Sequence, residues 1–125
     1  MRPQIVFVLS TNYAGSHFLS LQLGSHSRCL SLGEFHRYKR SPARRRQSCA
    51  ICDDDEQCPV FRGLGDVRLA NLFPKVFENI RAMDANITTG IDNSKKHDWA
   101  ELFVNADGFD KKVIHLIRDP RALVR

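Results

Sequence analysis

The sequence lacks any apolar run long enough to cross a membrane, since no stretch of its 125 residues approaches the roughly 18 consecutive apolar residues of a spanning helix. The apolar segment Ile5–Leu9 lies near the N-terminus, but it is too short for a signal peptide and no small-residue cleavage site follows it. We therefore expect a soluble, cytoplasmic protein with no membrane span. Hydrophobic residues make up 42% and charged residues 26%, which argues against wholesale disorder and, at this length, favours one domain.

Acidic residues are scarce in one part of the chain. Residues 28–46 contain seven lysines or arginines and a single acid, Glu34, which leaves 12 basic and 13 acidic residues for the rest of the sequence. Such a local block favours an anionic partner, although a solvated basic loop has the same composition. No periodicity persists through residues 36–63, so we interpret this stretch as a basic, cysteine-containing insertion or long loop.

Cysteine is also sparse, with four residues, and three of them cluster at Cys49, Cys52 and Cys58. In a cytoplasmic protein this usage argues against structural disulfides. Structural zinc needs four ligands, so the three thiols leave zinc, free thiols and a reversible disulfide all open. Residues 44–46, all arginine, would suit a zinc-stabilised basic module that binds nucleic acid. No aromatic residues interleave with them for base stacking, so we do not expect a nucleic-acid partner.

Strand and helix patterns alternate along the chain. Continuous apolar runs predict strands buried on both faces, and apolar residues three and four apart predict helices. The expected strands cover residues 4–9, 29–32, 87–91 and 113–117, and the expected helices end at Gly24, cover 69–83, and run from a capping box at 98–101 to about 106. Pro74 either kinks the second helix or marks its start. The alternation predicts an α/β domain with a parallel sheet.

Polar clusters follow the expected strands at the ends where ligands bind in open α/β sheets. After the first strand, Gly15 and Ser16 lie in a loop that opens a helix, where backbone N–H groups can hold a phosphate or sulfate. The Gly-Lys-Ser/Thr ending of a Walker A loop is missing. After the last strand comes Arg118, well placed to bind a phosphate with two N–H groups. An ordinary connecting loop, and a pair of Arg118 with an aspartate that braces the turn, are the alternatives.

Together these segments resemble the sulfotransferase family that uses PAPS (3′-phosphoadenosine 5′-phosphosulfate), and bacterial members in particular. The loop at 13–18 is similar to the family's 5′-phosphosulfate loop, and 114–123, with its Arg-Asp-Pro, resembles the 3′-phosphate motif. The Asp-Asn-Ser-Lys of 92–95 is similar to a strand-end segment of such proteins, and the Cys-x-x-Cys…Cys-Pro insert looks like one of theirs. The resemblance implies a three-layer α/β/α fold of the P-loop nucleotide-kinase type, with residues 1–125 as the N-terminal portion of a single domain.

The activity that this resemblance implies is transfer of a sulfuryl group from PAPS to an acceptor hydroxyl or amine. Such a transfer needs a general base, and Glu34 and His97 match the bases that different branches of the family use. Tyr13 stands where the family's loop carries a cation, and Lys95 or Lys96 could supply that charge. The resemblance assigns the following residues to PAPS binding: Asn12, Tyr13, Ala14, Gly15, Ser16, His17, Phe18 and Arg118.

Other interpretations of the same residues stay open. A salt bridge of Glu34 with Arg37 or Arg28, and a solvated His97, are the non-catalytic ones. The family's C-terminal part has no counterpart in this sequence, so an inactive nucleotide- or anion-binding fragment is the alternative function. The acceptor is undetermined, with an anionic glycan or a small molecule both compatible with the basic block. The oligomeric state is undetermined too, although an exposed edge of a parallel sheet invites self-pairing.

Overall fold

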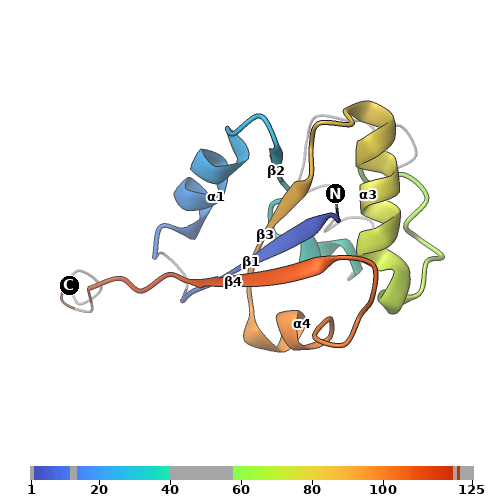
Figure 1. Cartoon of the computed structure of the whole chain (residues 1–125). Coiled ribbons are helices and arrows are strands. Elements are labelled where there is room, and N and C mark those ends of the chain that lie inside the picture. The colour runs from blue at the N-terminus through green and yellow to red at the C-terminus, as the bar shows by residue number, and fades with distance from the viewer. Residues whose placement is uncertain (1, 12–13, 40–57, 120, 122–125) are drawn as a thin grey trace.

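The computed structural model has a four-stranded, all-parallel sheet over the residues it describes (Figure 1). Those residues are 2–11, 14–39, 58–119 and 121. The strands are β1 (Gln4–Leu9), β2 (Cys29–Ser31), β3 (Thr89–Lys95) and β4 (Asp110–His115). Their order is β2-β3-β1-β4, so β3 and β1 are central and β2 and β4 are the edges. The predicted α/β domain with a parallel sheet is confirmed.

Helices cover both faces of the sheet. The helical elements are α1 (Ser16–Gly24), the short 3₁₀ helices η1 (Phe35–Lys39) and η3 (Leu69–Asn71), α3 (Leu72–Met83) and α4 (His97–Glu101). Leu19 of α1 packs against Val6 and Val8, whereas Ile5 and Phe7 belong to the core beneath α3 and α4. Figure 1 shows α1 on one side of the sheet and α3 on the other. The described chain therefore has a helical layer on each face.

The central strand β1 is buried on both faces, as its continuous apolar run predicts. Ile5 and Val8 point to opposite faces and both have 0% exposure. The backbone of β1 bonds to β3 on one side and to β4 on the other, with Gln4 opposite both Thr89 and Asp110. A strand with neighbours on both edges and helices on both faces has no solvated side, which is why the sequence pattern does not alternate.

The larger core consists mainly of aromatic residues. Phe73 of α3 is 0% exposed and lies at its centre. Its ring centroid is 4.7 Å from that of Phe103, 5.2 Å from Phe35, 5.3 Å from Phe109 and 5.7 Å from Phe7. Most of these pairs are tilted or edge-to-face, the arrangements that aromatic rings prefer. Segments far apart in the sequence are thus joined through one side chain.

Two strands differ from their expected bounds. β3 runs from Thr89 to Lys95 rather than over 87–91, and it includes the polar residues 92–95 that the sequence suggested would follow the strand. β4 runs from Asp110 to His115 rather than over 113–117, and its first three residues are all charged. The cause is backbone pairing, because β1 forms backbone hydrogen bonds with both strands over these polar residues. Their polar side chains interrupt the apolar pattern by which a strand is predicted from sequence.

The expected helix over 98–106 is also different. α4 covers His97–Glu101 and turns follow it, and its N-cap is Lys96 rather than Asp98, so the predicted capping box is wrong. Asp98 instead lies in the first turn and accepts a bond from the N–H of Trp99 at 3.0 Å. For the helix expected over 69–83, η3 is followed by α3, and Pro74 lies in the first turn of α3. The interpretation of Pro74 as a helix start is therefore the correct one.

Both ends of the stretch expected as an insertion pack on the core. At one end, His36 is 7% exposed. At the other, Asn79 of α3 donates from Nδ2 to the carbonyl oxygens of Val60 at 2.8 Å and Arg62 at 2.9 Å. The middle of the stretch, at 40–57, lies outside the described residues. The ends of the expected insertion are therefore parts of the folded domain.

Candidate functional site

The carboxyl ends of the strands meet at one edge of the sheet, where most of the predicted site residues lie. Leu9 at the end of β1 is opposite Lys95 of β3 and His115 of β4. The N–H of Leu116 bonds to the carbonyl of Leu9 at 2.8 Å, so the chain beyond β4 still follows β1. The loop before α1 and the segment that leads to Arg118 therefore leave neighbouring strands at the same edge.

The N-terminus of α1 opens at this edge. Its N-cap, Gly15, has φ 93°, a left-handed conformation that a residue without Cβ adopts without strain. Within the described chain no side chain caps α1, and its first turn has no acidic residue. The first N–H groups of a helix have no acceptor inside the helix, so those of Ser16, His17 and Phe18 are available to an anion.

The structure separates the roles of the predicted loop residues. Ser16 is 2% exposed, whereas the side chains of His17 and Phe18 point into solvent. Both residues lie in the first turn of α1, where their backbone N–H groups can contribute to a ligand site at the helix end. Ala14 and Gly15 precede them in the loop, and Asn12 and Tyr13 lie outside the described residues.

Glu34 and Lys95, both predicted catalytic residues, form an ion pair. Nζ of Lys95 lies 3.3 Å from Oε1 of Glu34, and Arg37 binds the other carboxylate oxygen at 3.0 Å. The side chains of Glu34 and Lys95 are 27% and 20% exposed. Lys95 has φ 68°, uncommon for a residue with a side chain, and the register between β1 and β3 shifts just before it. This bend ends β3 and directs the chain into α4.

A buried carboxyl group, Asp92, lies on the face beneath α4, and the sequence interpretation gave it no role. It accepts hydrogen bonds from Nε1 of Trp99 at 2.8 Å and from the N–H and hydroxyl groups of Ser94. Burial raises the pKa of Asp92 to about 6, although the bonds from Ser94 and Trp99 favour the charged form. Ser94 also accepts a bond from the N–H of His36 at 2.9 Å. The network ties β3 to α4 and to the segment after β2.

His97, the other predicted base, pairs with Glu101 and not with Glu34 or Lys95. Its side chain is 75% exposed and Nδ1 lies 3.5 Å from Oε1 of Glu101, one turn further along α4. It borders a mainly apolar hollow of about 200 Å³ between α4 and β4. The other residues that line this hollow are Phe7, Leu9, Ala100, Glu101, Val104, Lys111 and Val113.

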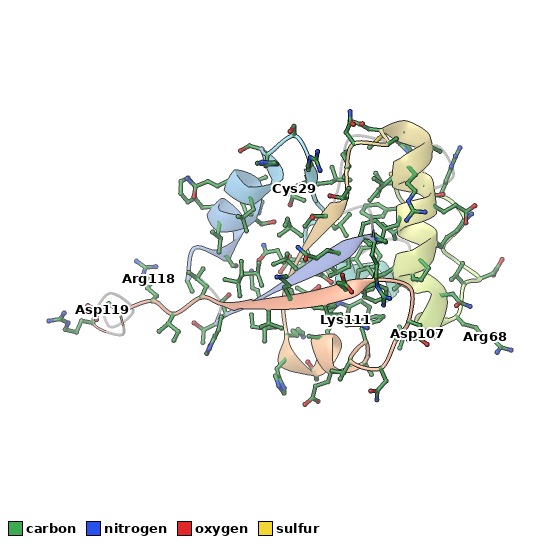
Figure 2. The ribbon with its side chains drawn as sticks, viewed as in Figure 1. Cys29, Arg68, Asp107, Lys111, Arg118 and Asp119 are labelled. Carbon is green, nitrogen blue, oxygen red and sulfur yellow. The ribbon has the colours of Figure 1, made fainter. Side chains whose placement is uncertain are left out.

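Arg118 lies beyond the end of β4 and is exposed. In the view of Figure 2 its side chain extends from the chain on the side where α1 lies. The next acidic residue, Asp119, binds Arg121, with Nη2 of Arg121 2.8 Å from Oδ2 of Asp119. These hydrogen bonds lower the pKa of Asp119. Asp119 therefore has Arg121 as an ion-pair partner.

The cysteine prediction falls mostly outside the described residues. Cys49 and Cys52 lie there, and Cys58 is buried, with its Sγ 3.4 Å from the N–H of Phe61. Within the described ranges, no three His, Cys, Asp or Glu side chains are grouped as a metal ion requires. The zinc site stays a prediction.

None of the helices in the described ranges combines the length and apolar character that a bilayer span requires. No protein-family model, no curated protein and no solved structure matches the chain.

Proposed function

We propose that this chain binds PAPS at the carboxyl edge of its sheet and transfers the sulfuryl group to an acceptor hydroxyl or amine. The fold would then be of the sulfotransferase type. The observation that carries the proposal is the pairing of β1 with β4, from Gln4 opposite Asp110 to Leu9 opposite His115. Because of it, two anion-binding elements, the N-terminus of α1 and Arg118, follow adjacent strand ends.

The N-terminus of α1 suits the phosphosulfate group. It combines N–H groups that have no acceptor within the helix with the positive end of a helix dipole, equivalent to roughly half an elementary charge. The left-handed Gly15 brings the chain into the helix, and among the described residues, apart from its two chain neighbours, none has an atom within 4 Å of the position that a Cβ would take there. The described residues therefore leave room for a ligand beside Gly15.

Arg118 suits the 3′-phosphate. A guanidinium can bind a phosphate with two parallel N–H donors and keeps its charge at any physiological pH. The exposed Arg118 follows the strand next to β1, so a nucleotide bound between the two elements would present its phosphates to different strands.

The ion pair of Glu34 and Lys95 supports the transfer step. In that step the bond between sulfur and the bridging oxygen of the phosphosulfate breaks, and a bond from sulfur to the acceptor oxygen or nitrogen forms. The acceptor's proton passes to Glu34, and Lys95 stabilises the negative charge on the leaving bisphosphate. Both side chains are partly exposed, so an acceptor can approach them from solvent.

One observation favours a second function, nucleotide binding without transfer. The carboxylate of Glu34 is bound by Lys95 on one oxygen and by Arg37 on the other, at 3.3 Å and 3.0 Å. Both carboxylate oxygens are thus engaged, so one of the two ion pairs has to open before Glu34 can accept a proton from an acceptor. If this arrangement persists with ligand bound, the chain would bind PAPS and leave it intact.

A thermal-shift titration tests the binding site. Adenosine 3′,5′-bisphosphate at 100 times its dissociation constant should stabilise the chain by about 2.7 kcal/mol, which raises the Tm by several degrees. We expect 5′-AMP, which lacks the 3′-phosphate, to bind about 10- to 100-fold more weakly. The variant Arg118→Ala should lose this preference and bind both nucleotides alike.

The matched control is Arg28→Ala. Arg28 is an exposed arginine whose carbonyl pairs with Thr88 and Thr89 at the amino-terminal edge, so the net charge changes equally and the preference should persist. Equal affinity of the unmodified chain for the two nucleotides would overturn the proposal. Incubation with PAPS and an acceptor panel then separates the two functions, because formation of the bisphosphate requires transfer and binding alone does not.

A further inference from the structure

Two buried polar atoms near α1 have no hydrogen-bond partner in the described part of the chain. They are Oδ1 of Asn93, in β3, and Oγ of Ser10, directly after β1. Asn93 is only 1% exposed, so bulk water does not solvate it. Since nearly all buried polar groups in proteins are hydrogen-bonded, these two atoms need an explanation.

Asn93 faces the side of the sheet that α1 covers. Its neighbours Asp92 and Ser94 point to the opposite face, where they bond to each other and Asp92 also binds Trp99. Side chains alternate along a strand, so Asn93 shares its face with Ile91, which packs in the cluster beneath α1.

Ser10 lies on the same face. It comes two residues after Val8, which belongs to the same cluster as Ile91. The N–H of Ser10 bonds to the carbonyl of Lys95 at 3.4 Å, so the chain stays beside β3 at this point. The loop that leaves Ser10 leads into α1 at Ser16, itself 2% exposed. Both unpartnered atoms therefore lie at the edge where the N-terminus of α1 opens.

We infer that Ser10 and Asn93 form the inner wall of the oxyanion site at α1, and that the Asn93 carboxamide binds the sulfate- or phosphate-type group directly. The inference rests on the proposed function and adds a binding residue to its site. A carboxamide has two donors and one acceptor. Turned with Nδ2 toward the anion, Asn93 donates to a ligand oxygen, and its Oδ1 is free to accept from a hydroxyl group such as that of Ser10.

The residue types suit a fully ionised tetrahedral anion. The wall has neutral donors, and the first turn of α1 adds N–H groups without an acidic side chain that would repel the ligand. An aspartate at position 93 would have almost the same shape but would bring a buried negative charge next to the anion. Replacement of the side-chain NH₂ group by a carboxylate oxygen therefore shows whether Asn93 contacts the anion directly or only packs beside the site.

A titration of the full-length, ¹⁵N-labelled chain with inorganic sulfate, followed by NMR, tests the inference. We expect the Asn93 side-chain NH₂ signals and the backbone amide signals of Ser16, His17 and Phe18 to shift with one common dissociation constant. Asn93→Asp should weaken sulfate binding at least tenfold, and Asn93→Ser, which is uncharged and shorter, should weaken it severalfold. Asn86→Asp makes the same charge change at an exposed residue before β3, at the other edge of the sheet, and should leave binding nearly unchanged.

The possible outcomes separate this inference from the proposed function. Wild-type sulfate affinity in both Asn93 variants would overturn it, even if adenosine 3′,5′-bisphosphate binds through Arg118. Weakened sulfate binding in these variants would support it, even if the chain does not distinguish the bisphosphate from 5′-AMP. If neither variant gives a dispersed spectrum, the wild-type Asn93 NH₂ signals decide, because their failure to shift at saturating sulfate would also overturn the inference.

Discussion

Asp92 is a carboxyl group in a strand that is otherwise enclosed by protein, and its surroundings determine its charge. It is 1% exposed, and its partners are neutral donors, the indole of Trp99, the amide and hydroxyl groups of Ser94 and the backbone N–H of Phe35. Desolvation outweighs these bonds, so the pKa rises from 3.8 to about 6. The folded protein therefore binds a proton at Asp92 over a pH range in which the unfolded chain has already lost it.

This shift predicts a stability that falls as pH rises. Between pH 3.8 and about 6 the folded state holds the proton and the unfolded state does not, so the free energy of unfolding decreases by about 3 kcal/mol and levels off above that range. Asp92→Asn cannot titrate and should lack this component. It also loses an acceptor at every pH, because its Nδ2 cannot accept from the indole N–H of Trp99 or from the groups of Ser94, whichever of the two it faces.

Urea denaturation at several pH values between 4 and 7.5 measures the effect. The wild type should lose about 2 kcal/mol relative to Asp92→Asn across this range, because part of the total loss already occurs below pH 4. Asp107→Asn makes the same substitution at an exposed aspartate and serves as the control. A constant difference between wild type and Asp92→Asn at all pH values would contradict the prediction.

Individual site residues were predictable to different degrees. Glu34 and Lys95 were identified through the family resemblance, as a candidate base and as a substitute for the loop cation, and the structure joins them in an ion pair. Asp92 and Asn93 belong to the Asp-Asn-Ser-Lys segment of 92–95, but neither residue was assigned a role of its own from the sequence alone. Their importance depends on burial, which the pairing of β3 with two neighbours creates and which no local pattern of residues records.

At the scale of elements, α1 packs against β1 and β3 through Leu19 and Leu23, but its contact with β2 is made by small residues. Ser20 is 0% exposed and its Oγ lies 2.7 Å from that of Ser31 in β2, while Phe18 and Leu21 are 66% and 53% exposed. A Cβ on Gly24 would lie 2.9 Å from the Cβ of Ser31 and 3.0 Å from its backbone nitrogen. Gly24 was predicted to end the helix, but this close contact with β2 could not be predicted from the sequence.

We predict that Gly24→Ala destabilises the protein. Alanine favours helix by about 1 kcal/mol over glycine, but overpacking against a backbone atom costs about 1–3 kcal/mol, so the net effect should be a Tm lower by several degrees. The control is Gly65→Ala, where no atom lies within 4 Å of the added Cβ and the change should stay within about 0.5 kcal/mol. Differential scanning calorimetry of the two variants gives the comparison. Equal Tm values for Gly24→Ala and Gly65→Ala would show that α1 can move away from β2 without a loss of stability.

Over the whole molecule, the sheet brings strand ends together and the aromatic core keeps them there. The alternation of strands and helices was sufficient to predict the parallel sheet, because each apolar run had to be covered on both faces. The strand order was not predictable in the same way, since it depends on which segments share the core. Phe73 of α3 contacts Phe35, which adjoins Glu34, and Phe7 of β1, so one helix supports two parts of the candidate site.

This arrangement predicts that Phe73 controls the stability of the whole domain. Phe73→Ala should cost about 3–5 kcal/mol, because it removes a ring that is 0% exposed and contacts four others. The free energy of unfolding of such a domain is about 5–15 kcal/mol in total, so Phe73→Ala should be only marginally stable. Phe73→Leu fills part of the space and should lose less of this free energy. Phe18→Ala removes the same side chain where it is 66% exposed and should change stability by no more than about 0.5 kcal/mol.

Hydrogen exchange distinguishes a shared core from a local one. If Phe73 joins the layers, Phe73→Leu should increase amide exchange in α3, in β1 and in the turn at Phe103 by a similar factor, because these segments then open together. Faster exchange restricted to α3 would mean that the helix rests on an independently stable sheet. The carboxyl edge would in that case keep its geometry without the aromatic core, and nucleotide affinity in Phe73→Leu would equal that of the wild type.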